Sequence, residues 1–375
     1  MPAARGATHN VAIVGAGLIS SLHIEAYQKL SPRARIAAIV DVDQDKAEAQ
    51  RARYGLEARC ESDYRRLLDD AAIDLVSVCV PPAAHADVAE TLLAAGKHVL
   101  LEKPMAPSLA ECDRIDQAAR RAGRLISVVT QKRFEDEVFH AKTIVERGLI
   151  GRVLHGQADS YWWRGDAYYD VPWRGNWKTE GGGCVFIHAV HHLDLLQWFM
   201  GMPVSVSAVV ANVGHPSSEA EDIAVATLEY PSGVLAQLNA SLVHHGERQG
   251  LSFQGERASV ALPWSVRANA SRKDGFPQDA PEVERELGET VEGLEPLRFT
   301  GHAGQIADLF DAIEADSQPM CDATQGRNAI ELITAIYASA AEKAPVALPL
   351  GIDHAFYAPG ATQRAMAEFM RGRRA

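Results

Sequence analysis

Short runs of apolar, mostly β-branched residues alternate with amphipathic stretches over the first third of the chain. The amphipathic stretches have helical spacing and end at Gly55, Gly96 and Gly123, where glycine readily terminates a helix. Uninterrupted apolar strands that alternate with helices are typical of a parallel sheet covered on both faces. We therefore expect a doubly wound α/β domain within residues 1–130, with strands at 11–14, 36–40, 75–80, 99–101 and 125–129.

The pattern changes after residue 130, where strands follow one another with few helices between them. Pro231, Ser232 and Gly233 separate two such strands and are typical of a hairpin turn. This arrangement predicts a second α/β domain, residues 131–375, with a large and mostly antiparallel sheet. Its expected strands are 153–162, 204–213, 223–230 and 234–243, and its expected helices are 136–147, 187–200, 304–316 and 324–341.

Composition narrows the class of protein. The chain has 375 residues, 47% of them hydrophobic, and a formal net charge of −12. An acidic chain repels phosphate backbones, so we expect no nucleic-acid partner. Its one basic cluster, Arg371, Arg373 and Arg374, is expected to be a frayed tail.

The chain shows no signal of export or membrane insertion. Its first ten residues are too short and polar for a signal peptide, and no apolar run has the length of a membrane span. The five cysteines are scattered and odd in number, which favours buried thiols in a reducing compartment. We expect a cytoplasmic protein without a membrane partner.

A glycine turn follows the first expected strand. Gly15 permits a tight turn, and Gly17 lets backbone amides approach a pyrophosphate at the start of the next helix. The third glycine of the usual dinucleotide fingerprint is Ser20, which is still small enough for close packing of helix on sheet. The expected cofactor site includes this turn and the helix start at Leu18 and Ile19.

An acidic residue completes this pattern. Asp41 ends the second strand about 20 residues after Ser20, where a carboxylate can bind ribose hydroxyls. Val42 and Asp43 follow it, with no arginine to bind a 2′-phosphate, so NAD is favoured over NADP. The alternative is a glycine-rich turn in an unrelated α/β protein.

Two further strand ends carry candidate cofactor residues. Pro81 and Pro82 follow the third expected strand and would hold an extended turn toward the nicotinamide, with His85 just beyond. The alternative is a plain strand-to-helix turn. Glu102 and Lys103 follow the strand at 99–101, and the bond from Lys103 to Pro104 is a candidate cis peptide. A solvated lysine at a strand exit is the alternative there.

Taken in order, these motifs resemble those of the glucose–fructose oxidoreductase / inositol dehydrogenase / MocA family. The resemblance extends over nearly the whole chain and includes the motifs Gly15–Gly17, Pro81-Pro82 with His85, Glu102-Lys103-Pro104, Gly181–Gly183 with His191 and Asp194, Gly301-His302 with Gln305 and Asp308, and residues 345–350. It implies an N-terminal Rossmann domain. It also implies a C-terminal domain for substrate binding and oligomerisation, with an open sheet that forms homodimers or homotetramers.

The resemblance also implies the catalytic pair. Lys103 corresponds to the family's catalytic or substrate-binding lysine, and His191 to its usual proton-transfer residue. This agrees with the chemistry, because removing hydride from a carbinol carbon also requires removing the hydroxyl proton. A lysine beside a cationic nicotinamide gives up its proton more readily, and a histidine needs little tuning to exchange one near neutral pH.

The chain departs from the family four residues before His191, where Ile187 replaces the usual Asp or Asn. We expect His188 to take over substrate contact or proton shuttling, and Asp194 to orient the ring of His191. Alternatively, His188 and His192 only pack or face solvent. A metal site formed by His188, His191, His192 and Asp194 is a further alternative. We expect no metal, because no distant cysteine or carboxylate cluster completes its coordination shell.

Substrate selection is expected from polar and aromatic groups that suit sugar rings. The candidates are Arg133, Arg164, Trp173, Asp194 and, by resemblance, His302. The alternative is an aromatic core or a subunit interface. The sequence thus predicts an NAD-dependent oxidoreductase for a secondary alcohol of a sugar, sugar derivative or polyol. Two rivals are a glycosidase that uses NAD transiently by oxidation and elimination, and a non-catalytic sensor of sugar or NAD.

Overall fold

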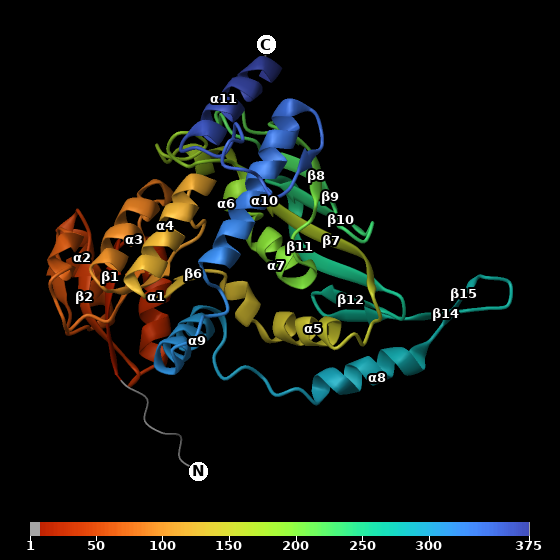
Figure 1. The fold of residues 1–375 in the computed structure, drawn as a ribbon, viewed down its shortest axis with the longest axis horizontal. Helices are drawn as coiled ribbons and strands as arrows, with labels where there is room; N and C mark the ends of the chain where they lie inside the picture. Colours follow the sequence, from red (N-terminus) through yellow and green to blue (C-terminus); the bar gives the residue numbers. More distant parts are fainter. Residues whose placement is uncertain (1–7, 375) are drawn as a thin grey trace. The chain divides into compact units, whose positions relative to one another are not determined.

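The computed structural model describes residues 8–374, and the chain divides into two compact units (Figure 1). Of the described residues, the first unit contains those up to Gln131 together with Arg298–Arg327, and the second contains Lys132–Leu297 and those from Asn328 onward. The first division lies next to the boundary expected at residue 130. The return of Arg298–Arg327 to the first unit differs from the expectation that residues 131–375 form one domain.

The first unit is built on a six-stranded parallel sheet in the order β3-β2-β1-β4-β5-β6. The expected doubly wound fold is confirmed, since the strand order reverses between β1 and β4. The edge strand β3 was not predicted, because its three residues contain no apolar run. The strands are β1 His9–Val14, β2 Ala34–Val40, β3 Arg59–Glu61, β4 Leu75–Val78, β5 His98–Leu101 and β6 Ile126–Val128.

Helices cover this sheet, and α9 joins them from late in the chain. Helix α9 packs against α1, while α3 packs against α4. Ile306, Leu309 and Phe310 of α9 are fully buried in the same hydrophobic core as Ile13 and Tyr27. The helices are α1 Leu18–Lys29, α2 Gln44–Tyr54, α3 His85–Ala94, α4 Leu109–Ala122 and α9 Gly301–Ala315, with short 3₁₀ turns η1 Tyr64–Leu67 and η2 Pro82–Ala84.

The second unit contains an eight-stranded sheet in the order β13-β12-β11-β7-β10-β9-β8-β16. The expected hairpin joins β9 to β10, and the pairing is mostly antiparallel as predicted, although β7 and β10 run parallel. A small ribbon of β14 and β15 lies in the region for which no element was predicted. The strands are β7 Val153–Trp163, β8 Ser205–Ala211, β9 Ile223–Glu229, β10 Leu235–Ser241, β11 Val243–Gly255, β12 Ser259–Leu262, β13 Ser265–Arg267, β14 Asn269–Ser271, β15 Pro277–Asp279 and β16 Val346–Ala347.

One face of this sheet is covered and the other is open. Along β9, Ala224, Ala226 and Leu228 are buried, whereas the alternating Val225 and Glu229 are exposed. Helices α6 and α7 contact β9, β10 and β7. The helices are α5 Asp136–Glu146, α6 Cys184–Ile187, α7 Val190–Met200, α8 Pro281–Glu292, α10 Ala323–Glu342 and α11 Ala361–Arg374, with 3₁₀ turns η3 Gln131–Phe134 and η4 Asp166–Tyr169.

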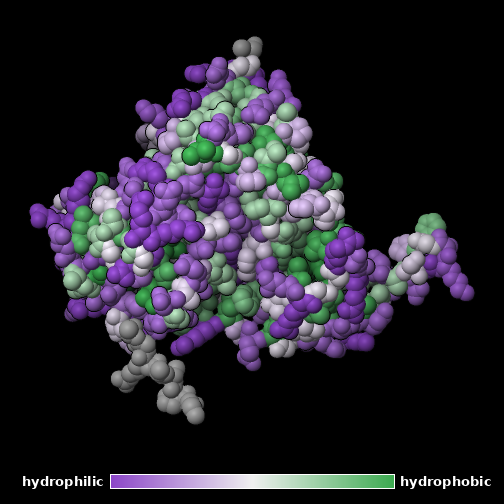
Figure 2. All heavy atoms as spheres, in the orientation of Figure 1, coloured by the Kyte–Doolittle hydropathy of each residue, from purple (hydrophilic) through white to green (hydrophobic). Residues whose placement is uncertain are grey.

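On the face that Figure 2 shows, hydrophilic residues are spread widely, with groups of hydrophobic residues between them. Arg371 and Arg373 belong to α11, and Arg373 donates a hydrogen bond to the carbonyl of Val210, so the expectation of a frayed tail is wrong. Within residues 8–374, no helix is both long and apolar enough to cross a membrane.

Candidate functional site

The glycine turn between β1 and α1 requires glycine at its first position. Gly15 has φ +100°, and a Cβ atom there would lie 2.5 Å from the carbonyl oxygen of Cys79. Gly17 is the N-cap of α1 and provides no side-chain cap, while the space around its Cα is open. The first amides of α1 are therefore available to an anion such as a pyrophosphate.

The residues after Gly17 complete the start of α1. Leu18 is 91% exposed, whereas Ile19 packs partly buried against the core. Ser20 is fully buried and its hydroxyl donates a hydrogen bond to the Gly17 carbonyl at 2.6 Å. Ser20 thus fills the position of a third glycine without obstructing the turn.

Asp41, at the end of β2, is oriented by two backbone amides. Its Oδ2 accepts a hydrogen bond from Ala16 at 2.8 Å, and its Oδ1 accepts one from Asp43 at 2.9 Å. The neighbouring Val42 is 94% exposed. An exposed apolar side chain, a fixed carboxylate and an uncapped helix start suit the adenine, ribose and pyrophosphate of a dinucleotide.

His85 connects two strand ends of this sheet. Its ring is fully buried, and its two nitrogens each lie 2.9 Å from a backbone carbonyl oxygen, of Val80 after β4 and of Pro104 after β5. Burial lowers the pKa of His85, against the effect of these two carbonyls. Pro81 is exposed and Pro82 half-buried in the turn η2, so the ring of His85 fixes the segment on which the two prolines lie.

Glu102 and Lys103 follow β5 directly, and the bond between Lys103 and Pro104 is cis, as predicted. Glu102 is 5% exposed, and its Oε2 accepts a hydrogen bond from the backbone amide of Lys103 at 3.0 Å. Lys103 itself is half-buried. The carboxylate of Glu102 therefore fixes the backbone from which the Lys103 side chain extends.

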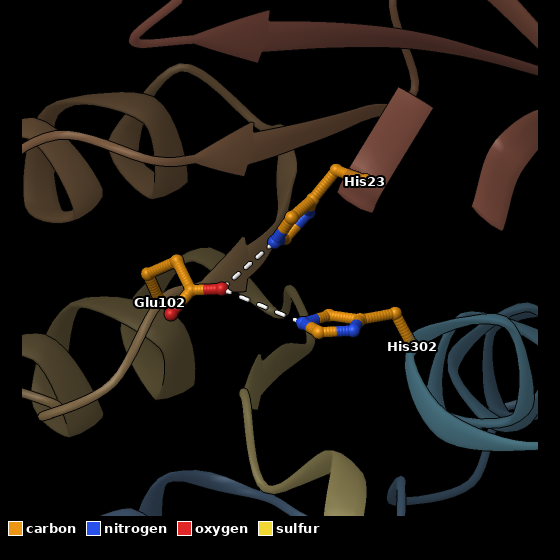
Figure 3. A group of neighbouring side chains, drawn as sticks. All are labelled: His23, Glu102 and His302. Atoms are coloured by element: carbon orange, nitrogen blue, oxygen red, sulfur yellow. Dashed lines mark hydrogen bonds and ion pairs between the residues drawn. The ribbon is translucent and has the colours of Figure 1, made fainter. Parts of the chain in front are cut away.

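Two histidines surround the other oxygen of Glu102 (Figure 3). Nε2 of His23, in α1, lies 2.9 Å from Oε1 of Glu102, and Nε2 of His302, in α9, lies 3.8 Å from the same oxygen. Burial opposes ionisation of Glu102, but its contacts with His23 and His302 and the nearby charge of Lys103 outweigh burial and lower its pKa. Glu102 is thus held as a carboxylate.

This network continues into the sheet. Nδ1 of His23 lies 3.2 Å from Oγ of Ser77, and the hydroxyl of Tyr27 lies 2.6 Å from the same oxygen. Burial raises the pKa of Tyr27, so the phenol stays protonated. Sequence reasoning missed His23, and its only signal was a polar residue on the apolar face of α1.

His23, Glu102 and His302 also form a potential metal-binding group. Their ligand atoms all lie within 4.8 Å of one another, and two imidazoles with one carboxylate are a donor set that zinc accepts. Among the residues that the structure describes, this is the only group of three or more potential ligands. The cluster considered from sequence, around His188 and His191, is not such a group.

In the second unit, His188 and His191 lie at the junction of two helices. His188 caps the C-terminus of the short α6, and His191 is the second residue of α7, so the expected continuous helix over 187–200 is interrupted at His188 and Ala189. Both histidines and Ile187 are half-buried. The ring of His188 lies 5.8 Å from Trp162 and 6.0 Å from Tyr168.

His192 differs from these two neighbours. It is 3% exposed, and its Nδ1 is buried without a hydrogen-bond partner among the described residues. Burial, together with the charge of Lys132, lowers the pKa of His192 to about 4. His192 therefore packs as a neutral side chain.

A buried carboxyl, Glu221, holds the glycine segment before α6. It accepts hydrogen bonds from the amides of Gly183 at 3.1 Å and Val185 at 3.0 Å, and from the hydroxyl of Tyr337 at 2.8 Å. A Cβ at Gly183 would overlap the Glu221 carbonyl. Burial raises the pKa of Glu221 to about 7. Sequence reasoning missed this residue, which lies next to the equally buried Asp222.

Arg133 and Asp194 bind each other. The guanidinium donates two hydrogen bonds to the carboxylate, at 2.8 and 2.7 Å, and both side chains are almost fully buried. Arg133 also lies over the ring of Trp198. The sequence predicts a substrate contact for Arg133 and a contact from Asp194 to His191. In the structure the Asp194 carboxylate binds Arg133, and Asp194 lies three residues after His191 on α7. The substrate contact of Arg133 stays a prediction.

The remaining candidates lie on the segment between β7 and α6. Arg164 is half-buried over the rings of Trp162 and Tyr168, whereas Trp173 is 45% exposed. Trp177, by contrast, is fully buried against Tyr337. The aromatic residues of this segment thus divide between the core and the surface.

Comparison with known proteins agrees with both units. Residues 9–130 match a family model described as an oxidoreductase family with an NAD-binding Rossmann fold, and residues 138–261 match the GFO/IDH/MocA C-terminal domain. The oxidoreductase YrbE of Bacillus subtilis (strain 168) is 29% identical over 91% of this chain and 96% of its own. Inositol 2-dehydrogenase 2 of Saccharopolyspora erythraea is 30% identical over 68% of this chain and 73% of its own.

Solved structures agree as well. The WlbA dehydrogenase of Bordetella pertussis, in complex with NADH and UDP-GlcNAcA, is 27% identical, with a TM-score of 0.78 over 92% of this chain and 100% of that one. The glycine turn with Asp41, the strand order and the two matched domains all lead to one assignment. The chain belongs to the GFO/IDH/MocA family of oxidoreductases, and its first unit is that family's NAD-binding Rossmann domain.

Proposed function

We propose that this protein is an NAD-dependent dehydrogenase that transfers hydride between the nicotinamide and a secondary alcohol of a sugar, sugar derivative or polyol. The observation that carries the proposal is Lys103, whose amide is held by the ionised Glu102 at the carboxyl end of a strand in the NAD-binding unit. The similarity to an inositol 2-dehydrogenase and to the sugar-nucleotide-bound WlbA supports this substrate class.

Asp41 supports NAD rather than NADP as the cofactor. Two amides fix its carboxylate at the end of β2, in the position from which such carboxylates bind ribose hydroxyls. A 2′-phosphate would meet this negative charge at short range, and Val42 and Asp43 offer it no cation. Bound NAD would supply the hydride acceptor, and bound NADH would supply the hydride donor.

The chain's own residues supply the proton chemistry. We assign to Lys103 and His191 the removal of the hydroxyl proton during oxidation and its return during reduction. His302 and His23 keep Glu102 ionised and so position Lys103. The ion pair between Arg133 and Asp194 anchors α7, and we assign it the positioning of His191 rather than contact with substrate. His188 is assigned to substrate contact.

The test is a panel of sugars, polyols and sugar acids, each offered with NAD or NADP and followed by nicotinamide absorbance. We expect at least one compound to reduce NAD in preference to NADP. Lys103→Ala should lower kcat/KM by at least about 100-fold, the contribution typical of a general base. The exposed Lys29 provides the matched control Lys29→Ala, which should leave the rate unchanged.

One result would end this proposal, and a second would remove one part of it. One is a panel in which no alcohol reduces either cofactor and no keto-sugar oxidises the reduced forms. The other is a Lys103→Ala enzyme as active as the parent, which would remove the role assigned to this lysine. Release of an aglycone without net NAD reduction would instead favour the glycosidase.

We further propose that the protein is a homo-oligomer that covers the open face of its second sheet. Val209 of β8 and Val225 of β9 are directly paired across the two strands and are 62% and 51% exposed. Apolar residues that adjoin on an exposed sheet face can form part of an interface with another protein surface. A second copy of this chain would remove them from water.

A further inference from the structure

Arg164 and Arg174 both pack against one aromatic ring in the second unit, that of Tyr168. The guanidinium carbon of Arg174 is 3.9 Å from the ring centre of Tyr168 and 4.5 Å from that of Trp173. The guanidinium carbon of Arg164 is 5.5 Å from the same tyrosine ring. Stacking on aromatic faces leaves the N–H edge of a guanidinium free for a planar acceptor.

The segment that carries these residues is held in place at several points. The amide of Arg164 donates to the carbonyl of Leu242, and its own carbonyl accepts from Nε2 of His215 at 2.8 Å. The other nitrogen of His215 lies 2.9 Å from the buried Asp222. Further along, the buried Trp177 donates to the carbonyl of Glu219 at 3.2 Å. The two arginines therefore extend from an ordered backbone.

The two guanidinium groups are not equally neutralised. Arg164 donates to Glu247 at 2.7 Å, so its charge is paired. The nearest carboxylate to Arg174 is Glu180, at 3.8 Å, which is too far for a hydrogen bond. Burial raises the pKa of Glu180, against the effects of the Gly175 amide and Arg174.

Arg174 is thus a half-buried cation whose bonding capacity is largely unused. Among the described residues its guanidinium makes no hydrogen bond, although a guanidinium has five N–H donors. Tyr168, on which Arg174 packs, also lies near His188, and the two ring centres are 6.0 Å apart. His188 lies three residues before His191, so the ring of Tyr168 connects Arg174 to a histidine to which the proposed function assigns substrate contact.

We propose that Arg174 binds an oxyanion of the substrate, so that the substrate of this enzyme is an acidic sugar or polyol carrying a carboxylate or phosphate. A planar guanidinium pairs with either group through two parallel N–H bonds. Tyr168 and Trp173 hold the guanidinium of Arg174, and Arg164, whose charge is paired with Glu247, packs over the same tyrosine ring. This inference rests on the proposed function and adds the charge of the substrate to it.

The test compares sugars that differ only in charge, namely glucose, glucuronate and glucose 6-phosphate, together with inositol and inositol phosphate. We expect an acidic member to have the highest kcat/KM. In Arg174→Gln, KM for that compound should rise roughly 10- to 100-fold, the range for a lost hydrogen bond to a charged group, while kcat changes little. KM for the neutral compound should stay the same, and Arg174→Lys should recover part of the loss.

Controls separate a specific effect from a general one. Arg285, which is exposed on α8, provides the control Arg285→Gln, which should leave every KM unchanged. A higher kcat/KM for glucuronate than for glucose 6-phosphate identifies the anion as a carboxylate, and the reverse order identifies it as a phosphate. If the parent enzyme uses neutral sugars as well as acidic ones, and Arg174→Gln alters neither, the inference is overturned while the proposed dehydrogenase stands.

Ligand binding gives a readout that does not depend on turnover. Glucuronate or glucose 6-phosphate should raise the thermal midpoint of the NAD-bound parent, and Arg174→Gln should abolish this shift. If no compound reduces NAD in any assay, the proposed function fails, and the midpoint shift still decides whether Arg174 binds an anion. Equal shifts in parent and Arg174→Gln, or no shift in the parent, would contradict the anion site.

Discussion

Nε2 of His23 lies 2.9 Å from Oε1 of Glu102, and the residue after Glu102 is Lys103, whose amide donates to the other carboxylate oxygen. The two partners of the first contact are 79 positions apart in the chain. Helix α1 thus begins at the proposed pyrophosphate site and, one turn later, fixes the carboxylate that orients the lysine. Cofactor binding and lysine positioning share one helix.

The lowered pKa of Glu102 predicts a specific response to acid. A carboxyl with a depressed pKa in the folded state stabilises the fold above its ordinary pKa and loses this contribution as the pH falls. The free energy of unfolding should therefore decrease as the pH is lowered below about 5. Glu102→Gln should show a shallower decrease, measured by urea unfolding from pH 3 to 7. Glu57→Gln, at an exposed position in the same unit, should retain the parental slope.

Glu221 predicts the opposite response. Its pKa is raised from 4.5 to about 7, so it stabilises the folded state when protonated and loses this contribution as the pH rises through that range. The unfolding free energy of the parent should fall by about 3 kcal/mol between pH 4.5 and 8 relative to Glu221→Gln. Glu368→Gln, at an exposed site on α11, serves as the control. Identical pH profiles for the parent and Glu221→Gln would show that Glu221 does not titrate in this range.

The buried ion pair between Arg133 and Asp194 predicts that replacing Arg133 alone strongly destabilises the fold. It also predicts that replacing Asp194 as well restores part of the lost stability. Arg133→Met leaves a buried carboxylate without its partner and should lower the unfolding free energy by about 3–5 kcal/mol. Adding Asp194→Leu removes the uncompensated charge and should recover part of that loss. The exposed substitution Arg285→Gln should change stability by less than about 0.5 kcal/mol. A loss below about 1 kcal/mol in Arg133→Met, measured in urea at pH 7, would contradict this account of the pair.

The open sheet face predicts an association that charge would disrupt. Replacing both Val209 and Val225 with lysine places two positive charges on the proposed interface. The parent should elute as a dimer or larger species in size-exclusion chromatography with light scattering, and the double variant as a smaller one. Ile352→Lys changes a similarly exposed apolar residue away from the strands and should leave the mass unchanged. A monomeric parent would exclude the proposed oligomer.

The sequence alone predicted those features that depend on neighbouring residues. Gly15 and Asp41 were found because a tight turn and a strand-end carboxylate follow apolar strands at fixed spacing. In the folded protein the Asp41 carboxylate accepts a hydrogen bond from the amide of Ala16, which lies in the glycine turn, so the two parts of the sequence pattern contact each other. The cis bond after Lys103 was likewise suggested by its proline.

The features that were missed depend on residues far apart in the chain. His23 gains its role from Glu102, and Arg133 is matched to Asp194, which lies 61 positions away. The spacing of apolar residues predicts which face of a helix or strand is buried, but it does not predict which residue a buried charged side chain contacts. The same reason explains why α9 was assigned to the second domain although its apolar face packs in the first unit.

The most direct test of the central claim follows the hydride itself. An alcohol from the panel that reduces NAD is prepared with deuterium on its carbinol carbon and incubated with the enzyme and NAD. We predict that the NADH formed carries one deuterium atom by mass spectrometry, and that the ketone product carries none at that carbon. NADH without deuterium would contradict direct hydride transfer from the secondary alcohol to the nicotinamide.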